Sequence, residues 1–160
     1  MKWLVPSGVL AMLCVAAPVA GRAQDATLVN PNQMKWAPAD VIPGVESAVL
    51  SGDPAKQQPF ILESRWPAGS KIGPHWHSSA EHIIIISGTG TVGMSDNFDL
   101  QKGMPITTGG FIEMPAKMHH WFVAQSPVVM LIVGDGPFDI TFINPEDDPR
   151  KKTVRRHIYP

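Results

Sequence analysis

Prolines and glycines interrupt this chain so often that few long regular elements fit between them. The sequence of 160 residues contains 16 prolines and 14 glycines. Proline breaks a helix, glycine weakens one, and no segment after residue 23 shows the apolar period of an amphipathic helix. Turn residues spaced roughly eight to twelve residues apart are typical of short strands joined by turns. We therefore predict an all-β fold of one domain.

Several segments between the turn residues have the apolar content expected of strands. They are residues 46–50, 60–66, 82–87, 89–94, 111–114, 119–124, 128–133 and 139–143, with shorter pieces near 71–76 and 104–107. Within 60–66, Phe60, Leu62 and Trp66 share one face, while Glu63 and Arg65 share the other. This alternation is typical of a half-buried antiparallel strand, so we expect a small antiparallel barrel.

The four isoleucines at residues 83–86 break this alternation. Both faces of that strand are apolar, so both are expected to be covered. One face would fill the interior of the barrel, and the other needs a second layer. The N-terminal arm or another subunit can supply that layer. We favour a homodimer, because an exposed isoleucine stripe promotes aggregation.

The first 23 residues have the composition of a secretory signal peptide. Lys2 is followed by an apolar run over residues 3–20, and Ala23 offers a cleavage point before Gln24. The run is interrupted by prolines and is short for a membrane span of about 20 residues. We expect a cleaved signal peptide at 1–23, an N-terminal arm at 24–45, a barrel at 46–143 and a basic tail at 144–160.

The only cysteine supports the same interpretation. Cys14 follows Leu13 rather than a small residue, which disfavours lipid attachment at this position. Cleavage leaves a chain with no thiol and no disulfide in an oxidising compartment. We expect an exported protein, periplasmic or secreted, without a stable membrane anchor.

Charge is distributed unevenly along the chain. All 14 acidic residues lie between Asp25 and Asp148, whereas the final stretch RKKTVRRHIYP carries five basic residues and no acidic one. Five charges are a small footprint for phosphate binding, and an exported protein seldom meets nucleic acid. We expect the tail to fold over its own acidic body, to contact a partner subunit or to stay mobile, and we expect no nucleic-acid partner.

A histidine cluster carries the strongest functional signal. His75 and His77 are two residues apart, which puts both imidazoles on the same side of a strand, and Glu81 follows the small-residue turn SSA. His119 and His120 come in a later strand. Imidazole with carboxylate suits one divalent transition metal ion of the Fe, Mn, Ni, Cu or Zn type rather than Ca or Mg.

The spacing of these residues resembles the first motif of the cupin superfamily. The pattern Gly-x5-His-x-His-x3-Glu-x6-Gly is met at Gly69, His75, His77, Glu81 and Gly88. The resemblance extends over roughly residues 46–143. It implies a single conical cupin barrel, an antiparallel double-stranded β-helix or jelly roll.

The second cupin motif, Gly-x5-Pro-x-Gly-x2-His-x3-Asn, is similar to the segment from Gly109 through Pro115 to His120. Lys117 replaces its turn glycine and Ala124 replaces its asparagine. A positive φ at the turn position would make the lysine costly there. Neither departure falls on a metal ligand of the family.

The resemblance implies a metal site made of His75, His77, Glu81 and His120. Four protein ligands on an octahedral ion leave two positions for water, O₂ or a chelating substrate. The register of the second motif favours His120 over its neighbour His119, which then points outward. His82 has the opposite parity to Glu81 and is expected at the surface or an interface.

Residues two along from a ligand are expected to line an apolar cup around the metal. The candidates are Phe122, Ala124, Ile83 and Ile85, joined by Met114, Met130 or Trp66. Such a cup suits an aromatic or hydrophobic small-molecule ligand better than a sugar phosphate. Trp76 and Trp121 have the opposite parity and are expected to pack against a neighbouring sheet or subunit.

The site favours a metal-dependent oxidoreductase of dioxygenase type acting on a small organic molecule. A lyase, decarboxylase or isomerase would instead use Glu113, the carboxylate nearest the motifs, as acid or base. Two alternatives remain, because a fold by itself does not determine chemistry. One is a non-catalytic metal- or ligand-binding sensor module, and the other is a purely structural metal site.

Overall fold

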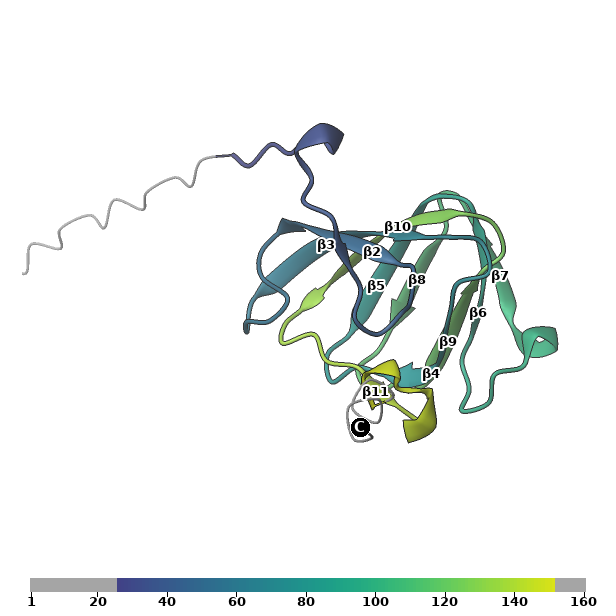
Figure 1. The fold of residues 1–160 in the computed structure, drawn as a ribbon. Coiled ribbons are helices and arrows are strands. Elements are labelled where there is room, and N and C mark those ends of the chain that lie inside the picture. Colours follow the sequence, from purple (N-terminus) through teal and green to yellow (C-terminus); the bar gives the residue numbers. More distant parts are fainter. Residues whose placement is uncertain (1–25, 152–160) are drawn as a thin grey trace, which may run out of the picture.

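The computed structural model describes residues 26–151 as two antiparallel β-sheets that face each other, which confirms the predicted all-β fold (Figure 1). The predicted signal peptide at residues 1–23 and the tail beyond residue 151 lie outside the described residues. Among residues 26–151, no helix is long and apolar enough to span a bilayer.

The first sheet has six strands in the order β1-β2-β3-β10-β5-β8. Its strands are β1 (Ala37–Pro38), β2 (Glu46–Ser51), β3 (Pro59–Trp66), β10 (Val128–Asp135), β5 (Glu81–Ser87) and β8 (Phe111–Met114). Short 3-10 helices lie at Pro31–Gln33, Leu100–Lys102 and Pro145–Asp147.

The second sheet has five strands in the order β11-β4-β9-β6-β7. Its strands are β11 (Thr141–Phe142), β4 (Lys71–Trp76), β9 (His120–Ala124), β6 (Thr89–Gly93) and β7 (Met104–Thr107). The chain passes from one sheet to the other between most successive strands, which is the double-stranded β-helix or jelly roll (Figure 1).

Every predicted strand coincides with an observed one to within two residues at each end. The alternation in β3 is also confirmed, because Phe60, Leu62 and Trp66 are buried while Arg65 is exposed. The sequence missed β1, a two-residue strand inside the N-terminal arm that pairs with β2. It is too short to show a periodic pattern.

The isoleucine run has one buried and one open face. Ile83 and Ile85 lie inside the barrel, with 6% and 1% of their surface exposed, whereas Ile86 on the outer face is 45% exposed. Ile84 is half-buried between its strand neighbours Leu131 and Phe111. The expectation that both faces are covered is therefore not met within residues 26–151.

The turn that leads into β9 has the backbone strain suspected from the sequence. Lys117 has φ +64°, a left-handed conformation that costs a residue with a Cβ about 1–2 kcal/mol. The backbone holds this conformation because Lys117 N–H donates to His77 O at 2.8 Å, which ties the turn to the end of β4.

We expect Lys117→Gly to raise the free energy of unfolding by about 1 kcal/mol, because glycine adopts a positive φ without strain. Urea denaturation measures this change. Lys117→Ala is the matched control, since it removes the charge and keeps the Cβ, and it should give no comparable gain. Equal gains from both variants would assign the effect to the charge instead of the backbone.

Candidate metal centre

Three strands bring the predicted ligands to one end of the barrel. His75 lies in β4 opposite His120, the first residue of β9, and His77 follows the end of β4 directly. The turn at residues 78–80 then reverses the chain into the opposite sheet, where Glu81 begins β5. All four side chains are buried, with at most 4% of each residue exposed.

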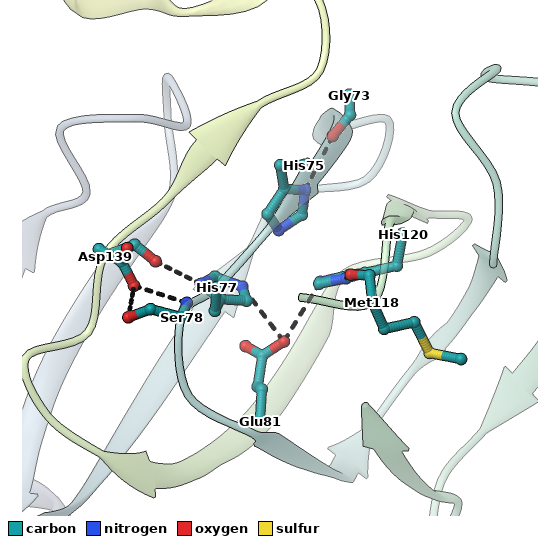
Figure 2. Close-up of polar contacts among 8 residues, drawn as sticks. All are labelled: Gly73, His75, His77, Ser78, Glu81, Met118, His120 and Asp139. Atoms are coloured by element: carbon teal, nitrogen blue, oxygen red, sulfur yellow. Dashed lines mark hydrogen bonds and ion pairs between the residues drawn. The ribbon is translucent and has the colours of Figure 1, made fainter. Parts of the chain in front are cut away.

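The three imidazoles converge on a common point (Figure 2). One ring nitrogen from each of His75, His77 and His120 lies within 4.8 Å of the other two. The Glu81 carboxylate closes the group, with Oε2 3.5 Å from His77 Nε2 and 3.4 Å from His120 Nε2. Three buried histidines with this geometry can hold a metal ion.

Backbone carbonyls fix the orientation of each imidazole. The Nδ1 atoms of His75, His77 and His120 lie 2.8, 2.6 and 2.9 Å from the carbonyl oxygens of Gly73, Asp139 and Met118. A carbonyl only accepts, so each Nδ1 carries a proton, and Nε2 is the atom through which each imidazole, once neutral, can bind a metal ion.

The electrostatics of the group favour cation binding. Burial, followed by repulsion from His120 and His77, lowers the pKa of His75 to about 3. Burial alone would raise the pKa of Glu81, but the adjacent imidazoles of His120 and His77 outweigh it and lower that pKa to about 2. At neutral pH the group therefore contains a neutral His75 and an ionised Glu81.

His77 shows the opposite balance. Burial pushes its pKa down, but the interaction with Glu81 and the contact with Asp139 outweigh burial and raise the pKa above its usual value. His77 Nε2 is also the one buried side-chain polar atom without a hydrogen-bond partner in the part of the chain described. A metal ion would satisfy this atom, so the residues fit the group that the cupin resemblance implies.

The raised pKa predicts proton release on metal binding. At pH 6.5 a larger fraction of His77 than of an ordinary histidine is doubly protonated, and the ion must displace this proton, whereas His75 is already neutral. We expect proton release on metal binding at this pH, and a metal affinity that rises with pH until His77 is neutral. Calorimetric titration in buffers of different ionisation enthalpy measures the number of protons released. No release at pH 6.5 would contradict the protonated state inferred for His77.

The other titratable residues near the motifs lie outside the barrel. His119 points outward, with its side chain 39% exposed and its Nδ1 2.6 Å from Asp96. His82 stacks on Phe111 on the outer face, and Glu113 pairs with it across the strands and is exposed. Glu113 therefore cannot serve as an acid or base in the barrel, which corrects the role that a lyase or isomerase would have given it.

An apolar cavity of about 190 Å³ extends from the metal centre into the barrel. It is lined by the four predicted ligands and by Ala39, Val41, Ile42, Ser47, Leu62, Ser64, Trp66, Ile72, Ile83, Phe122, Met130, Ile132, Phe138 and Ile140. Ile83, Phe122, Met130 and Trp66 match the predicted cup. Ala124, Ile85 and Met114 are buried elsewhere in the core and do not line the cavity.

Several lining and supporting residues had no signal in the sequence. Phe138 stacks on the His77 ring, with centroids 4.4 Å apart and planes 13° from parallel. The Asp139 carboxylate accepts hydrogen bonds from Ser78 N–H and Ser78 Oγ at 2.8 and 2.7 Å, which anchors the turn between His77 and Glu81. Residue 139 is far from the motifs in sequence, and its backbone oxygen leaves no trace in residue type.

Comparisons with known proteins find one matching family model and several similar folds. The family model of the Cupin domain matches residues 62–134. No curated protein matches the chain in sequence. Three similar solved structures show the same fold at low identity.

The polyketide cyclase RemF from Streptomyces resistomycificus is 17% identical, with a TM-score of 0.64 over 81% of this chain and 94% of that chain. A candidate acetylacetone dioxygenase from Methylibium petroleiphilum is 19% identical, with a TM-score of 0.62 over 81% of this chain and 88% of that chain. An RmlC-like cupin from Shewanella frigidimarina is 13% identical, with a TM-score of 0.57 over 70% of this chain and 92% of that chain.

Proposed function

We propose that the protein is a cupin that binds one divalent transition metal ion and acts on a small apolar molecule as an oxidoreductase of dioxygenase type. The ligands are His75, His77, Glu81 and His120. The observation that carries this proposal is the convergence of three imidazoles and one carboxylate at the end of an apolar cavity. A bound ion supplies a Lewis-acid centre with open positions for ligands.

The cavity lining favours redox chemistry over general acid–base chemistry. Among the described residues that line it, the proposed metal ligands are the only ones with titratable side chains of the carboxylate, imidazole or amine type. A lyase or isomerase needs a separate group to move a proton. In an oxidoreductase of this type, a bound metal ion would supply the redox chemistry. The protein residues would only need to form a dry pocket of the right shape.

The test combines metal analysis with oxygen uptake. Protein purified without chelators should contain about one transition metal ion per chain. After loading with Fe²⁺, it should consume oxygen when offered small phenols or β-diketones. Metal content near zero, with unchanged stability, would refute metal binding. Full metal content without oxygen uptake or product for any of these compounds would favour the second candidate.

The second candidate is a metal- or ligand-binding module without turnover. The same enclosed apolar lining that protects a reaction also suits capture of a hydrophobic molecule.

Export to the periplasm or the cell exterior is part of both proposals and is supported by the composition of residues 1–23. Detection of the mature chain in the periplasmic or culture fraction, beginning at Gln24, tests it.

We also propose that the open face of the first sheet packs against a second copy of the chain. Ile86 and Phe111 on this face are 45% and 58% exposed. The half-buried Ile84 lies between Phe111 and the half-buried Leu131 on the same face. Sedimentation analysis should show a dimer for the natural chain and a monomer for Ile86→Lys. A natural chain that is monomeric at micromolar concentration would refute the dimer.

A further inference from the structure

We infer that the ligand of the cavity is a single-ring molecule with a metal-binding oxygen at one end and a hydroxyl group at the other, and that Ser47 receives this hydroxyl. The inference rests on the proposed function and specifies the substrate class of the same site. It comes from the layered lining of the cavity and from two serine hydroxyls far from the metal centre.

Strand pairing orders the cavity into successive layers. Glu81, at the metal centre, is level with Phe60 across β10. The next layer inward contains Leu62, Ile83 and Ile132, and the layer after that contains Ser64 paired with Met130 on one side and Ser47 on the other. Ser64 is four residues along β3 from Phe60, about 13 Å at about 3.3 Å per residue.

The length and volume fit one ring with a substituent at each end. A metal–oxygen bond of about 2 Å and a hydrogen bond of about 2.8 Å leave about 8 Å between the two end atoms of the ligand. A dry cavity of about 150 Å³ accepts benzene, and this one has about 190 Å³. The middle layer of leucine and isoleucine side chains suits the flat apolar body of such a ring.

The hydrogen bonds of the two serines determine what the far end accepts. Ser64 Oγ receives hydrogen bonds from Trp66 Nε1 at 3.0 Å and from Ser47 Oγ at 3.1 Å. Its own hydroxyl points to Glu46 O at 3.4 Å. Ser47 is among the lining residues, its hydroxyl donates to Ser64 Oγ, and no donor within residues 26–151 reaches its Oγ, so the lone pairs of this oxygen are unused. It is suited to a ligand group that donates a hydrogen bond.

The cavity lining carries no positive charge, which excludes a ligand with an anionic group at the end far from the metal. No lysine or arginine is among the described residues that line the cavity. A carboxylate or phosphate placed beside Ser47 would lose its hydration without gaining a counter-ion, which is costly. A neutral hydroxyl loses much less hydration and regains one hydrogen bond from the lone pair of Ser47.

A purely structural role of the serines has a different signature. Ser64 satisfies the indole N–H of Trp66, and that function needs no contribution from Ser47. A second pair of this kind exists outside the cavity, where Trp121 Nε1 donates to Ser95 Oγ at 3.3 Å. Ser95→Ala is therefore a matched control for Ser47→Ala, since it also removes a hydroxyl near a tryptophan.

The test is a calorimetric titration of the Ni²⁺-loaded full chain with three probes: benzoate, 4-hydroxybenzoate and terephthalate. We expect 4-hydroxybenzoate to bind roughly three- to tenfold more tightly than benzoate, as one added hydrogen bond allows. Terephthalate should bind at least tenfold more weakly than benzoate. In Ser47→Ala, the preference for 4-hydroxybenzoate should disappear while the affinity for benzoate is retained. Ser95→Ala should keep the full preference.

The outcomes separate this inference from the proposed function. Nickel content is measured on the same samples, and a chain that does not retain nickel refutes the metal site on which both depend. A loaded protein that binds none of the probes, or binds benzoate and 4-hydroxybenzoate equally, overturns the inference and leaves metal binding in place. A preference that survives in Ser47→Ala overturns the role of Ser47. The comparison of probes on the natural chain remains decisive if the variant does not fold.

Discussion

His120→Ala is expected to abolish stoichiometric metal binding, with an affinity loss of roughly a hundredfold or more. The variant removes one of three converging Nε2 atoms and leaves Glu81 without one of its two imidazole partners. The adjacent His119→Ala should leave metal content unchanged, because that side chain points outward to Asp96. Elemental analysis of both variants after identical dialysis measures the difference.

Thermal unfolding gives an independent readout of the same pair. An ion present at a hundred times its dissociation constant stabilises the folded chain by about 2.7 kcal/mol. The natural chain and His119→Ala should therefore show a higher melting temperature with added metal, and His120→Ala should not. If His119→Ala loses the metal and His120→Ala keeps it, the register assigned to β9 (His120–Ala124) is wrong.

Gly88→Ala is expected to lower the free energy of unfolding by roughly 3 kcal/mol or more. Gly88 has φ +91°, which costs any residue with a Cβ about 1–2 kcal/mol. A Cβ there would also lie 2.1 Å from the carbonyl oxygen of Pro127, so the backbone itself must shift. A loss of this size in the free energy of unfolding is large for a single substitution. Urea denaturation of the metal-free chain measures the change without the contribution of the ion.

Gly69→Ala is the matched comparison, because Gly69 opens the same motif that Gly88 closes. Its φ is +81°, and a Cβ would meet nothing within 4 Å. It should cost only the conformational strain, about 1–2 kcal/mol. Equal losses from the two variants would show that the contact with Pro127 adds nothing, and that the two glycines are needed only for their backbone conformation.

Much of the fold follows from local pattern. Turn residues delimit the strands, and period-two alternation assigns the inner face of β3 through Phe60, Leu62 and Trp66. The same parity puts His119 and His120 on opposite faces, and the resemblance to the second cupin motif implied that His120 is the inner one. These features can be predicted because they depend on the spacing of residues within one strand, which the sequence records directly.

The surroundings of the candidate site could not be predicted in the same way. The partners of the three imidazoles are backbone oxygens of Gly73, Met118 and Asp139, and an oxygen that every residue carries gives no sequence signal. The alternation also left open the parity of Glu113 across Pro115, which the pairing of β8 with β5 determines.

Spacing along single segments was enough to define the strands and their inner faces, and the resemblance to the cupin motifs implied the cluster of His75, His77, Glu81 and His120. What surrounds that cluster depends on contacts between segments, which spacing does not record. Pairing between strands distant in the chain set Ser47 and Ser64 at the far end of the cavity, and the folded barrel stacked Phe138 on the imidazole of His77. The fold also left Ile86 uncovered on the outer face, since covering depends on which segments reach that surface.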